Sequence, residues 1–163
     1  MELEKLNYII EISKIVAVLF TGFSFLFGIY IYMVNSKKER VKSTLEYWGK
    51  FYQEIIPFIT AFNTQYSGKL HAKEIREMDN LPDTKNTLHN ILNKYEQLVI
   101  GIDLKAYEIK ALNLLSGQEI ISSFHRYEGY IFHRRIQKNN PQIWSQFEEL
   151  TKKLIELRNS NNF

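Results

Sequence analysis

Residues 15–34 read IVAVLFTGFSFLFGIYIYMV, a run of twenty residues without a charged side chain. As an α-helix this run is about 30 Å long, which is the thickness of the hydrocarbon core of a bilayer. A buried helix of a soluble protein shows a polar stripe within three turns, and this run has none. The sequence therefore predicts a single transmembrane helix at residues 15–34.

A cleaved secretory signal peptide is the alternative interpretation of an apolar run so close to the N-terminus. Against it, the run is longer than the apolar region of a signal peptide, the residues before it are not basic, and no Ala-x-Ala-like cleavage site follows. We therefore interpret the run as a retained anchor. Residues 1–36 then form the N-terminal tail and anchor, and residues 37–163 form a second domain, which is long enough for one core.

The basic residues beside the run predict its orientation. Only two precede it, whereas four follow within eight positions: Lys37, Lys38, Arg40 and Lys42. Because the basic flank of a membrane helix stays on the cytoplasmic side, we expect the N-terminus outside and residues 37–163 in the cytoplasm. The expected location is the inner (cytoplasmic) membrane, crossed once, with the lipid bilayer as a partner.

Small residues recur on one side of the predicted transmembrane helix, at Ala17, Thr21, Ser24 and Gly28. Such stripes let membrane helices approach one another closely, although an apolar run also contains this spacing by chance. We favour self-association and expect a homo-oligomer, for instance a tetramer.

An apolar seam with heptad spacing follows the anchor. Its members are Val41, Leu45, Trp48, Tyr52, Ile55, Ile59 and Phe62. The seam indicates either a coiled coil between subunits or a helix face packed on the rest of the domain. We favour packing, because several of these side chains are bulky for a coiled coil. Pro57 is expected to kink or interrupt this helix.

Helical spacing of apolar residues continues to the end of the chain. It predicts an all-α fold, in which the transmembrane helix precedes a cytosolic domain of four to five helices. A cap at Asp83 or Thr84 is expected to begin one helix that ends near Asp103. The remaining predicted helices lie at about 72–78, 107–115, 118–137 and 141–158.

Catalytic patterns are missing from the sequence. The chain has no cysteine, which excludes a disulfide scaffold, a thiolate zinc site and a cysteine nucleophile. Its four histidines form no HExxH motif, and neither a P-loop nor a nucleophile elbow is present. We expect no enzyme, no catalytic residue, no metal site and no cofactor.

One face of the segment 118–137 and the position after it are basic. This face offers cations for phosphates and a tyrosine ring for stacking on a base, a combination that suits a nucleotide. The candidate ligand-binding residues are Arg126, Tyr130, His133, Arg134 and Lys138. By composition alone, a solvated polar face or a subunit interface explains the same residues. An internal ion pair between Glu96 and Arg126 is also expected.

The stretch from Leu88 to Leu154 contains LHNILNKYEQLVIGIDLKAYE, FHRYEGYIFHRR and NPQIWSQFEEL. In this order and spacing, it resembles an uncharacterised bacterial family of membrane-anchored helical proteins. The resemblance implies an N-terminal membrane helix and a cytosolic α-helical head, and it implies no activity.

The overall plan also resembles the small membrane effector associated with type III CRISPR systems. That protein is an oligomer whose cytosolic head binds cyclic tetra-adenylate and whose membrane part then harms the infected cell. The resemblance implies an antiviral effector in which a cyclic oligoadenylate second messenger triggers membrane disruption or pore opening, with no DNA partner. The alternative function is a membrane-tethered scaffold that binds a protein partner and no nucleotide.

Overall fold

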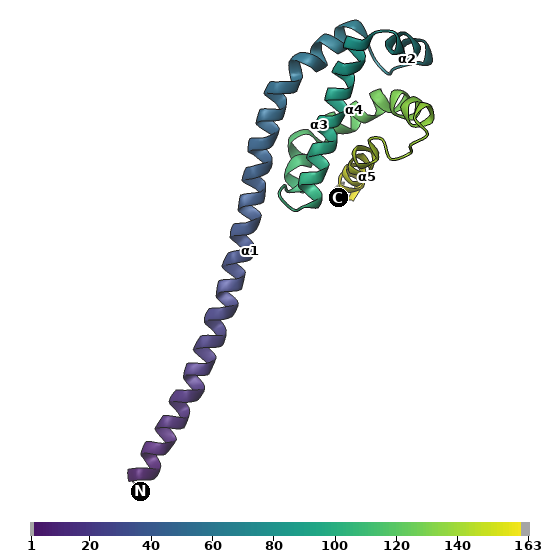
Figure 1. Cartoon of the computed structure of the whole chain (residues 1–163). Helices are drawn as coiled ribbons and strands as arrows, with labels where there is room; N and C mark the ends of the chain where they lie inside the picture. Colours follow the sequence, from purple (N-terminus) through teal and green to yellow (C-terminus); the bar gives the residue numbers. More distant parts are fainter. Residues whose placement is uncertain (1, 161–163) are drawn as a thin grey trace. The chain divides into compact units, whose positions relative to one another are not determined.

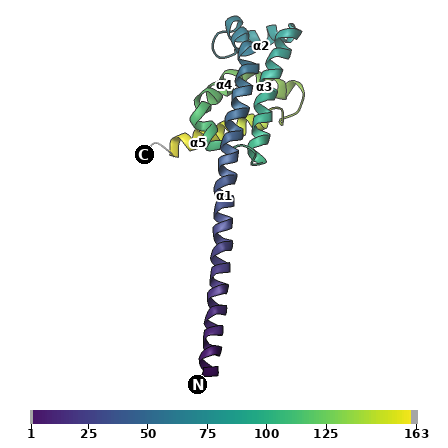
Figure 2. The same ribbon diagram turned by 90° about the vertical axis from the view of Figure 1, so that its left-hand side faces the viewer.

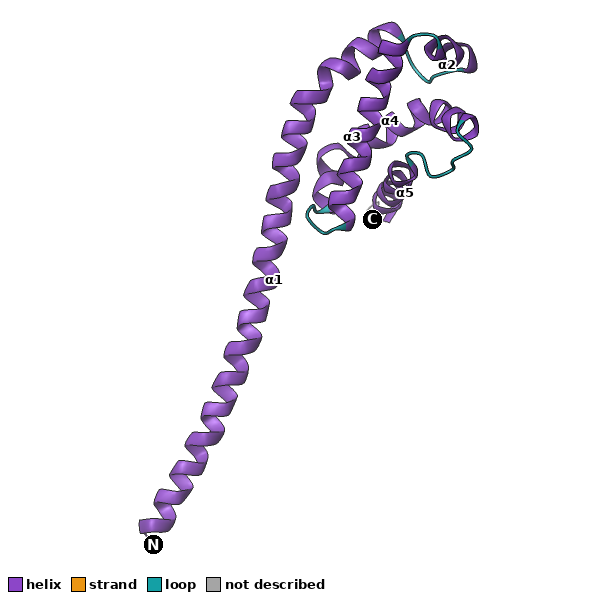
Figure 3. Cartoon of the chain, in the orientation of Figure 1, coloured by secondary structure: helices purple, strands orange, loops and turns teal. Residues whose placement is uncertain are grey.

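The computed structural model describes residues 2–160, and every element in this range is a helix (Figure 3). The prediction of an all-α fold with a long apolar helix followed by a helical domain is confirmed. The five helices are α1 (Glu2–Gln65), α2 (Ala72–Asp79), α3 (Pro82–Asp103), α4 (Ile109–Gln137) and α5 (Ser145–Ser160).

The chain forms two compact units, Met1–Glu39 and Arg40–Phe163. In the first unit, the side chains from Ile15 to Met33 are all exposed, and Phe23 is 72% exposed. A core helix of a soluble protein would bury such residues, so this part of α1 is not one. It is long and apolar enough to cross a membrane.

The second unit has its own hydrophobic core, in which α3 is central. In both views α3 runs alongside the C-terminal half of α1 (Figures 1 and 2). The ring of Tyr95 on α3 lies 5.2 Å from that of Phe51 on α1 and stacks on Phe147 of α5 at 4.4 Å. Phe124 of α4 meets the edge of Phe147 at 5.4 Å. Aromatic contacts thus join four helices around one point.

The seam after the apolar run packs on this core, but its buried stripe differs from the predicted one. Leu45 is 48% exposed and Tyr52 is 41% exposed. The buried positions are Thr44, Trp48, Phe51, Ile55, Phe62 and Tyr66. A straight helix has 3.6 residues per turn, so a strict heptad seam drifts away from a partner that does not supercoil with it.

Pro57 does not end the helix, because α1 continues to Gln65. Its ring lies on the exposed side. Figure 1 shows α1 bending over in its last turns, as expected where a proline removes one hydrogen bond of the helix.

Two predicted helix starts were wrong, those of α3 and α5. Helix α3 begins with Pro82 at its first position after Leu81, and neither Asp83 nor Thr84 caps it. The predicted break between the helices at 107–115 and 118–137 is confirmed as a kink inside α4 at Ser116, where φ is −149° and ψ is 18°. Pro82 suits the first position of α3, because an N–H group at that position would have no acceptor within the helix.

Helix α5 begins at Ser145 and not near Pro141, because Trp144 has a positive φ of 51°. Glu96 on α3 lies at this N-terminus: burial raises the pKa of its carboxyl group, and the backbone N–H groups of Gln146 and Phe147 act against that rise. The predicted ion pair of Glu96 with Arg126 is not formed, and this N-terminus takes its place.

Candidate functional site

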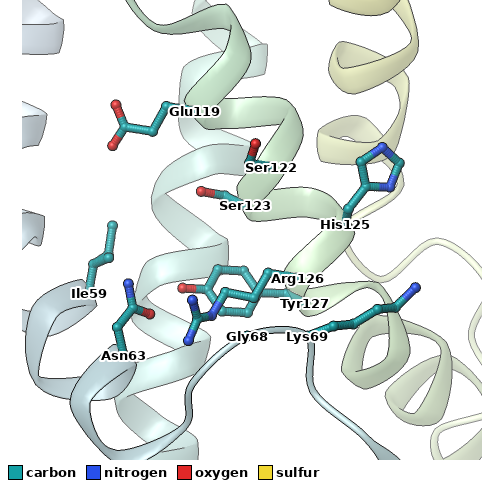
Figure 4. A pocket seen from close by; sticks show the side chains of 10 residues that line it. All are labelled: Ile59, Asn63, Gly68, Lys69, Glu119, Ser122, Ser123, His125, Arg126 and Tyr127. Carbon is teal, nitrogen blue, oxygen red and sulfur yellow. The ribbon is translucent and has the colours of Figure 1, made fainter.

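A cleft of about 510 Å³ opens between the end of α1, the α1–α2 loop and α4 (Figure 4). Ten residues from these elements line it, and most of them have polar side chains. They are Ile59, Asn63, Gly68, Lys69, Glu119, Ser122, Ser123, His125, Arg126 and Tyr127.

The α1–α2 loop forms one wall of the cleft because it is bonded to α4 at Arg126 and Glu128. The guanidinium of Arg126 donates to the carbonyl of Tyr66, and its own carbonyl accepts from the N–H of Leu70 at 3.1 Å. Nζ of Lys69 lies 3.1 Å from the carboxylate of Glu128. Arg126 therefore both lines the cleft and holds the loop that shapes it.

A glycine on α4 permits this close approach. A Cβ atom at Gly129 would lie 3.1 Å from the carbonyl oxygen of Leu70 and 3.3 Å from the side chain of Ile75. The loop itself turns at Gly68, whose φ of +81° suits glycine. Both glycines therefore contribute to placing Lys69 over α4.

Two buried polar atoms of the cleft have no hydrogen-bond partner, Oδ1 of Asn63 and Nε of Arg126. The guanidinium of Arg126 points toward Asn63 (Figure 4). Leaving a buried donor or acceptor unpaired costs about 1–3 kcal/mol. A polar ligand bound in this cleft would pair both atoms, because it could donate to Oδ1 of Asn63 and accept from Nε of Arg126.

The other polar side chains of the cleft differ in their hydrogen bonds and in their exposure to solvent. The hydroxyl of Ser123 accepts a hydrogen bond from Tyr95 at 3.1 Å, whereas Ser122 is exposed. Burial raises the pKa of Glu119, and a hydrogen bond from Tyr52 acts against that rise. In Figure 4, Glu119 lies at the end of the cleft away from Arg126, and His125 points toward α5.

The structure divides the predicted ligand-binding residues among three places. Arg126 lines the cleft. Tyr130, His133 and Arg134 lie together in a second polar network, and Lys138 is exposed at the C-terminal end of α4. Tyr130 is fully buried, so its ring faces neighbouring side chains and offers no surface for a base.

The second network joins α2, α3 and α4. Nε2 of His133 donates to Oδ2 of Asp79 at 2.8 Å, and Lys85 lies 3.6 Å from the other oxygen of this carboxylate. Burial would raise the pKa of Asp79, but the hydrogen bond from His133 and the nearby cations hold it below its usual value. These contacts fix α2 on its neighbours.

Next to this pair, the Tyr130 hydroxyl and Nε2 of His89 share a hydrogen bond of 2.7 Å. Burial raises the pKa of Tyr130 to about 12, and burial together with Arg134 and Lys85 lowers the pKa of His89. Arg134 is only 9% exposed and donates to the side chain of Gln137. Three of the predicted residues thus make internal contacts.

Sequence reasoning missed Asn63 and Lys69, because both come from the end of α1 and its following loop. The 4-residue spacing of Ser122 and Arg126 on one helix face was the visible signal for the α4 side of the cleft. No pattern in the sequence indicates that residues 66–70 cross over that face.

Comparison with known proteins identifies a family. Residues 12–154 match the family described as "Domain of unknown function (DUF4760)", so the chain belongs to it. The match agrees with the resemblance to an uncharacterised helical family and carries no link to CRISPR-associated effectors. No curated protein and no solved structure matches the chain.

Proposed function

We propose that this member of the DUF4760 family is a membrane-anchored receptor whose helical domain binds an anionic ligand of the nucleotide type. The site is the cleft between the end of α1, the α1–α2 loop and α4. The observation that supports this most is the pair of buried, unpartnered atoms in it, Nε of Arg126 and Oδ1 of Asn63. A ligand with both an acceptor and a donor pairs them together.

Phosphate and nucleobase chemistry fits the two atoms. A phosphate oxygen accepts from Arg126, while an amino or hydroxyl group donates to Asn63. The volume of about 510 Å³ lies within the range of about 300–1,000 Å³ that small-molecule sites have. It suits one nucleotide unit of a ligand.

A cyclic oligoadenylate, such as cyclic tetra-adenylate, is the specific ligand that we propose to test first. A ring of several nucleotides exceeds one cleft, so it would occupy the clefts of several copies in a homo-oligomer. The guanidinium that binds the ligand through Nε also donates to the carbonyl of Tyr66, and Tyr66 directly follows α1. Binding would thereby bias the end of the helix that carries the apolar run.

The biological output that we propose is antiviral defence by membrane disruption or pore opening. The apolar run holds the protein in the inner membrane, with its N-terminus outside and the helical domain in the cytoplasm. The basic residues that follow the run support this orientation.

Thermal unfolding of the full-length protein in detergent tests the ligand. The panel contains inorganic phosphate, mononucleotides, and linear and cyclic oligoadenylates. A ligand at about 100 times its Kd stabilises the folded state by about 2.7 kcal/mol. Absence of a shift in Tm with every member of the panel contradicts the proposal.

The variants Asn63→Ala and Arg126→Gln test the site. Asn63→Ala removes an unpartnered acceptor, so we expect an unchanged or higher Tm without ligand and a smaller shift with ligand. Arg126→Gln should abolish the shift. Lys138→Ala is the matched control, because Lys138 is exposed on α4 and outside the cleft. Equal shifts in all three variants rule out this cleft.

A protein-binding scaffold is the second candidate function. It is favoured by two exposed apolar side chains one turn apart on α4, Phe132 at 46% and Ile136 at 82% exposure. Ile136→Asp should then abolish capture of a partner while leaving nucleotide-induced stabilisation unchanged. Loss of capture without any nucleotide response in the unmodified protein would favour this function over the first.

A further inference from the structure

The loop between α3 and α4 exposes an apolar side chain next to cations. Leu104 is 76% exposed, and Lys105 beside it is also exposed. Lys110, in the first turn of α4, is exposed as well, and Leu114 on the next turn is 86% exposed. Leucine at such exposure, flanked by lysine, is typical of surfaces that meet a membrane interface.

The backbone of this loop holds Leu104 in place. The N–H of Ala106 donates to the carbonyl of Gly101 at 2.8 Å, and that of Lys105 donates to the carbonyl of Ile102 at 2.9 Å. These bonds form a Schellman motif, in which the residue after the cap adopts a left-handed conformation. That residue is Lys105, with a φ of +57°, where glycine is usually favoured. The chain thus carries a positive charge where the backbone favours glycine.

The loop is bonded to the first residues of the same unit. The N–H of Glu108 donates to the hydroxyl of Thr44 at 2.8 Å, and Nε of Arg40 donates to the carboxylate of Glu108 at 3.4 Å. The ring of Tyr107 lies 4.8 Å from that of Tyr47. Wherever residues 40–47 are, this loop is beside them.

Chain length places those residues near the bilayer. Arg40 is six residues after Val34, the last residue of the apolar run, and six residues span at most about 20 Å even when fully extended. The polar region of each leaflet is itself about 5–7 Å thick. This step rests on the membrane anchoring in the proposed function, and it does not depend on the ligand.

The charge near the loop is positive. The two acidic residues beside the loop are each paired with a cation: Asp103 lies 3.4 Å from Lys153, and Glu108 is bonded to Arg40. In the part of the chain that the structure describes, no ion pair joins Lys105 or Lys110 to an acidic residue. Both lysines are therefore available to anionic headgroups.

We infer that the α3–α4 loop is a lipid-contact site of the helical domain. Leu104 enters the interfacial region of the bilayer, and Lys105 and Lys110 bind the headgroups of anionic lipids. The contact joins the domain to the membrane surface at the loop that is bonded to Arg40 and Thr44.

Single-cysteine probes test this inference directly, because the natural chain has no cysteine. The full-length protein is placed in lipid nanodiscs, with a fluorophore at Ala106→Cys, Lys73→Cys or Leu26→Cys, and its quenching by spin-labelled lipid is measured. Lys73 lies on α2, which is bonded to the first turn of α3 through Asp79 and Lys85. The side chain of Lys73 is 87% exposed. Helix α3 has 22 residues and is about 33 Å long, and it separates α2 at its N-terminal end from the α3–α4 loop at its C-terminal end. Lys73 is therefore the control position far from the loop.

We expect several-fold stronger quenching at Ala106 than at Lys73 in discs that contain phosphatidylglycerol, and a loss of this difference in pure phosphatidylcholine or at high salt. Lys105→Gly should weaken the quenching at Ala106 while raising Tm, because glycine relieves the left-handed backbone. A structural role of Lys105 alone would leave the quenching unchanged.

The outcomes separate the two premises. If the probe at Leu26 is quenched but the probe at Ala106 is quenched no more than the probe at Lys73, the loop contact is overturned and the anchor is left intact. Absence of quenching at Leu26 overturns the anchor itself. Equal quenching at Ala106 in neutral and anionic discs overturns the recognition of anionic lipid.

Discussion

Gly101 on α3 shows how one missing methyl group decides local packing. A Cβ atom there would overlap the ring of Tyr107, which is itself packed on Tyr47. We predict that Gly101→Ala destabilises the fold by about 1–3 kcal/mol, the usual cost of overpacking. Gly49→Ala is the matched control, because nothing lies within 4 Å of its Cβ position in α1.

The control should behave in the opposite way. Gly49→Ala is expected to stabilise the helix by about 0.5–1 kcal/mol, since alanine loses less backbone entropy on folding. Unfolding midpoints of both variants check the pair. Equal effects of the two substitutions would contradict the packing of Tyr107 on Gly101.

His89 predicts a pH dependence of stability. Its pKa is lowered from 6.5 by burial and by the cations Arg134 and Lys85. Between the folded and unfolded pKa values the unfolded state binds more protons, so stability falls as the pH drops below about 6.5. Asp79 contributes stability of the same sign in a lower pH range: its pKa is lowered from 3.8 in the folded state, so its contribution is lost only as the pH falls below about 4.

Urea unfolding at about pH 7 and about pH 5 tests this residue. We expect the loss of stability at the lower pH to be smaller in His89→Gln than in the unmodified protein. His125→Gln, at an exposed position, should lose as much as the unmodified protein. Comparing the variants separates the contribution of His89 to the pH dependence from the contributions of Glu96 and Glu119. Burial raises the pKa values of these two carboxyl groups. Parallel losses in all proteins would contradict the role of His89.

At the scale of elements, the C-terminal half of α1 is a core helix of the second unit. Phe51 is 3% exposed and contacts Tyr95, whereas Leu45 is 48% exposed. We predict that Phe51→Ala costs about 3–5 kcal/mol of folding free energy, and that Leu45→Ala changes it by about 0.5 kcal/mol or less. Chemical denaturation of both variants measures the difference.

The same pair distinguishes packing from a coiled coil. A coiled coil along the predicted heptad seam would use Leu45, so its loss would dissociate an oligomer in light scattering. The buried stripe through Phe51 predicts no such change.

At the scale of the whole molecule, the second unit is compact and has its own core. We predict that a fragment of residues 40–163 is soluble and unfolds cooperatively, because its apolar side chains are buried without residues 1–39. The full-length protein should fractionate with membranes, since residues 15–33 expose apolar side chains. Circular dichroism melts and membrane fractionation check both parts, and a fragment that aggregates or melts without a transition contradicts the division.

The helices and the apolar run were determined by local sequence. Periodicity over 10 to 20 residues, the twenty-residue uncharged run and the turn residues act within a few residues of one another, so α2, α3 and the break at Ser116 were foreseeable. The polar face of α4 was foreseeable for the same reason, and Ser122 and Arg126 of that face line the cleft.

Tertiary structure alone decided the site. Whether Tyr130 and Arg134 face solvent or neighbouring helices depends on where α2 and α3 pack, and no spacing within α4 reports this. Asn63 and Lys69 reach the cleft because the α1–α2 loop bonds to the backbone of α4 at Arg126, about 60 residues along the chain. A helix period is a local property of a chain, whereas burial and pairing are set by the contacts between distant segments.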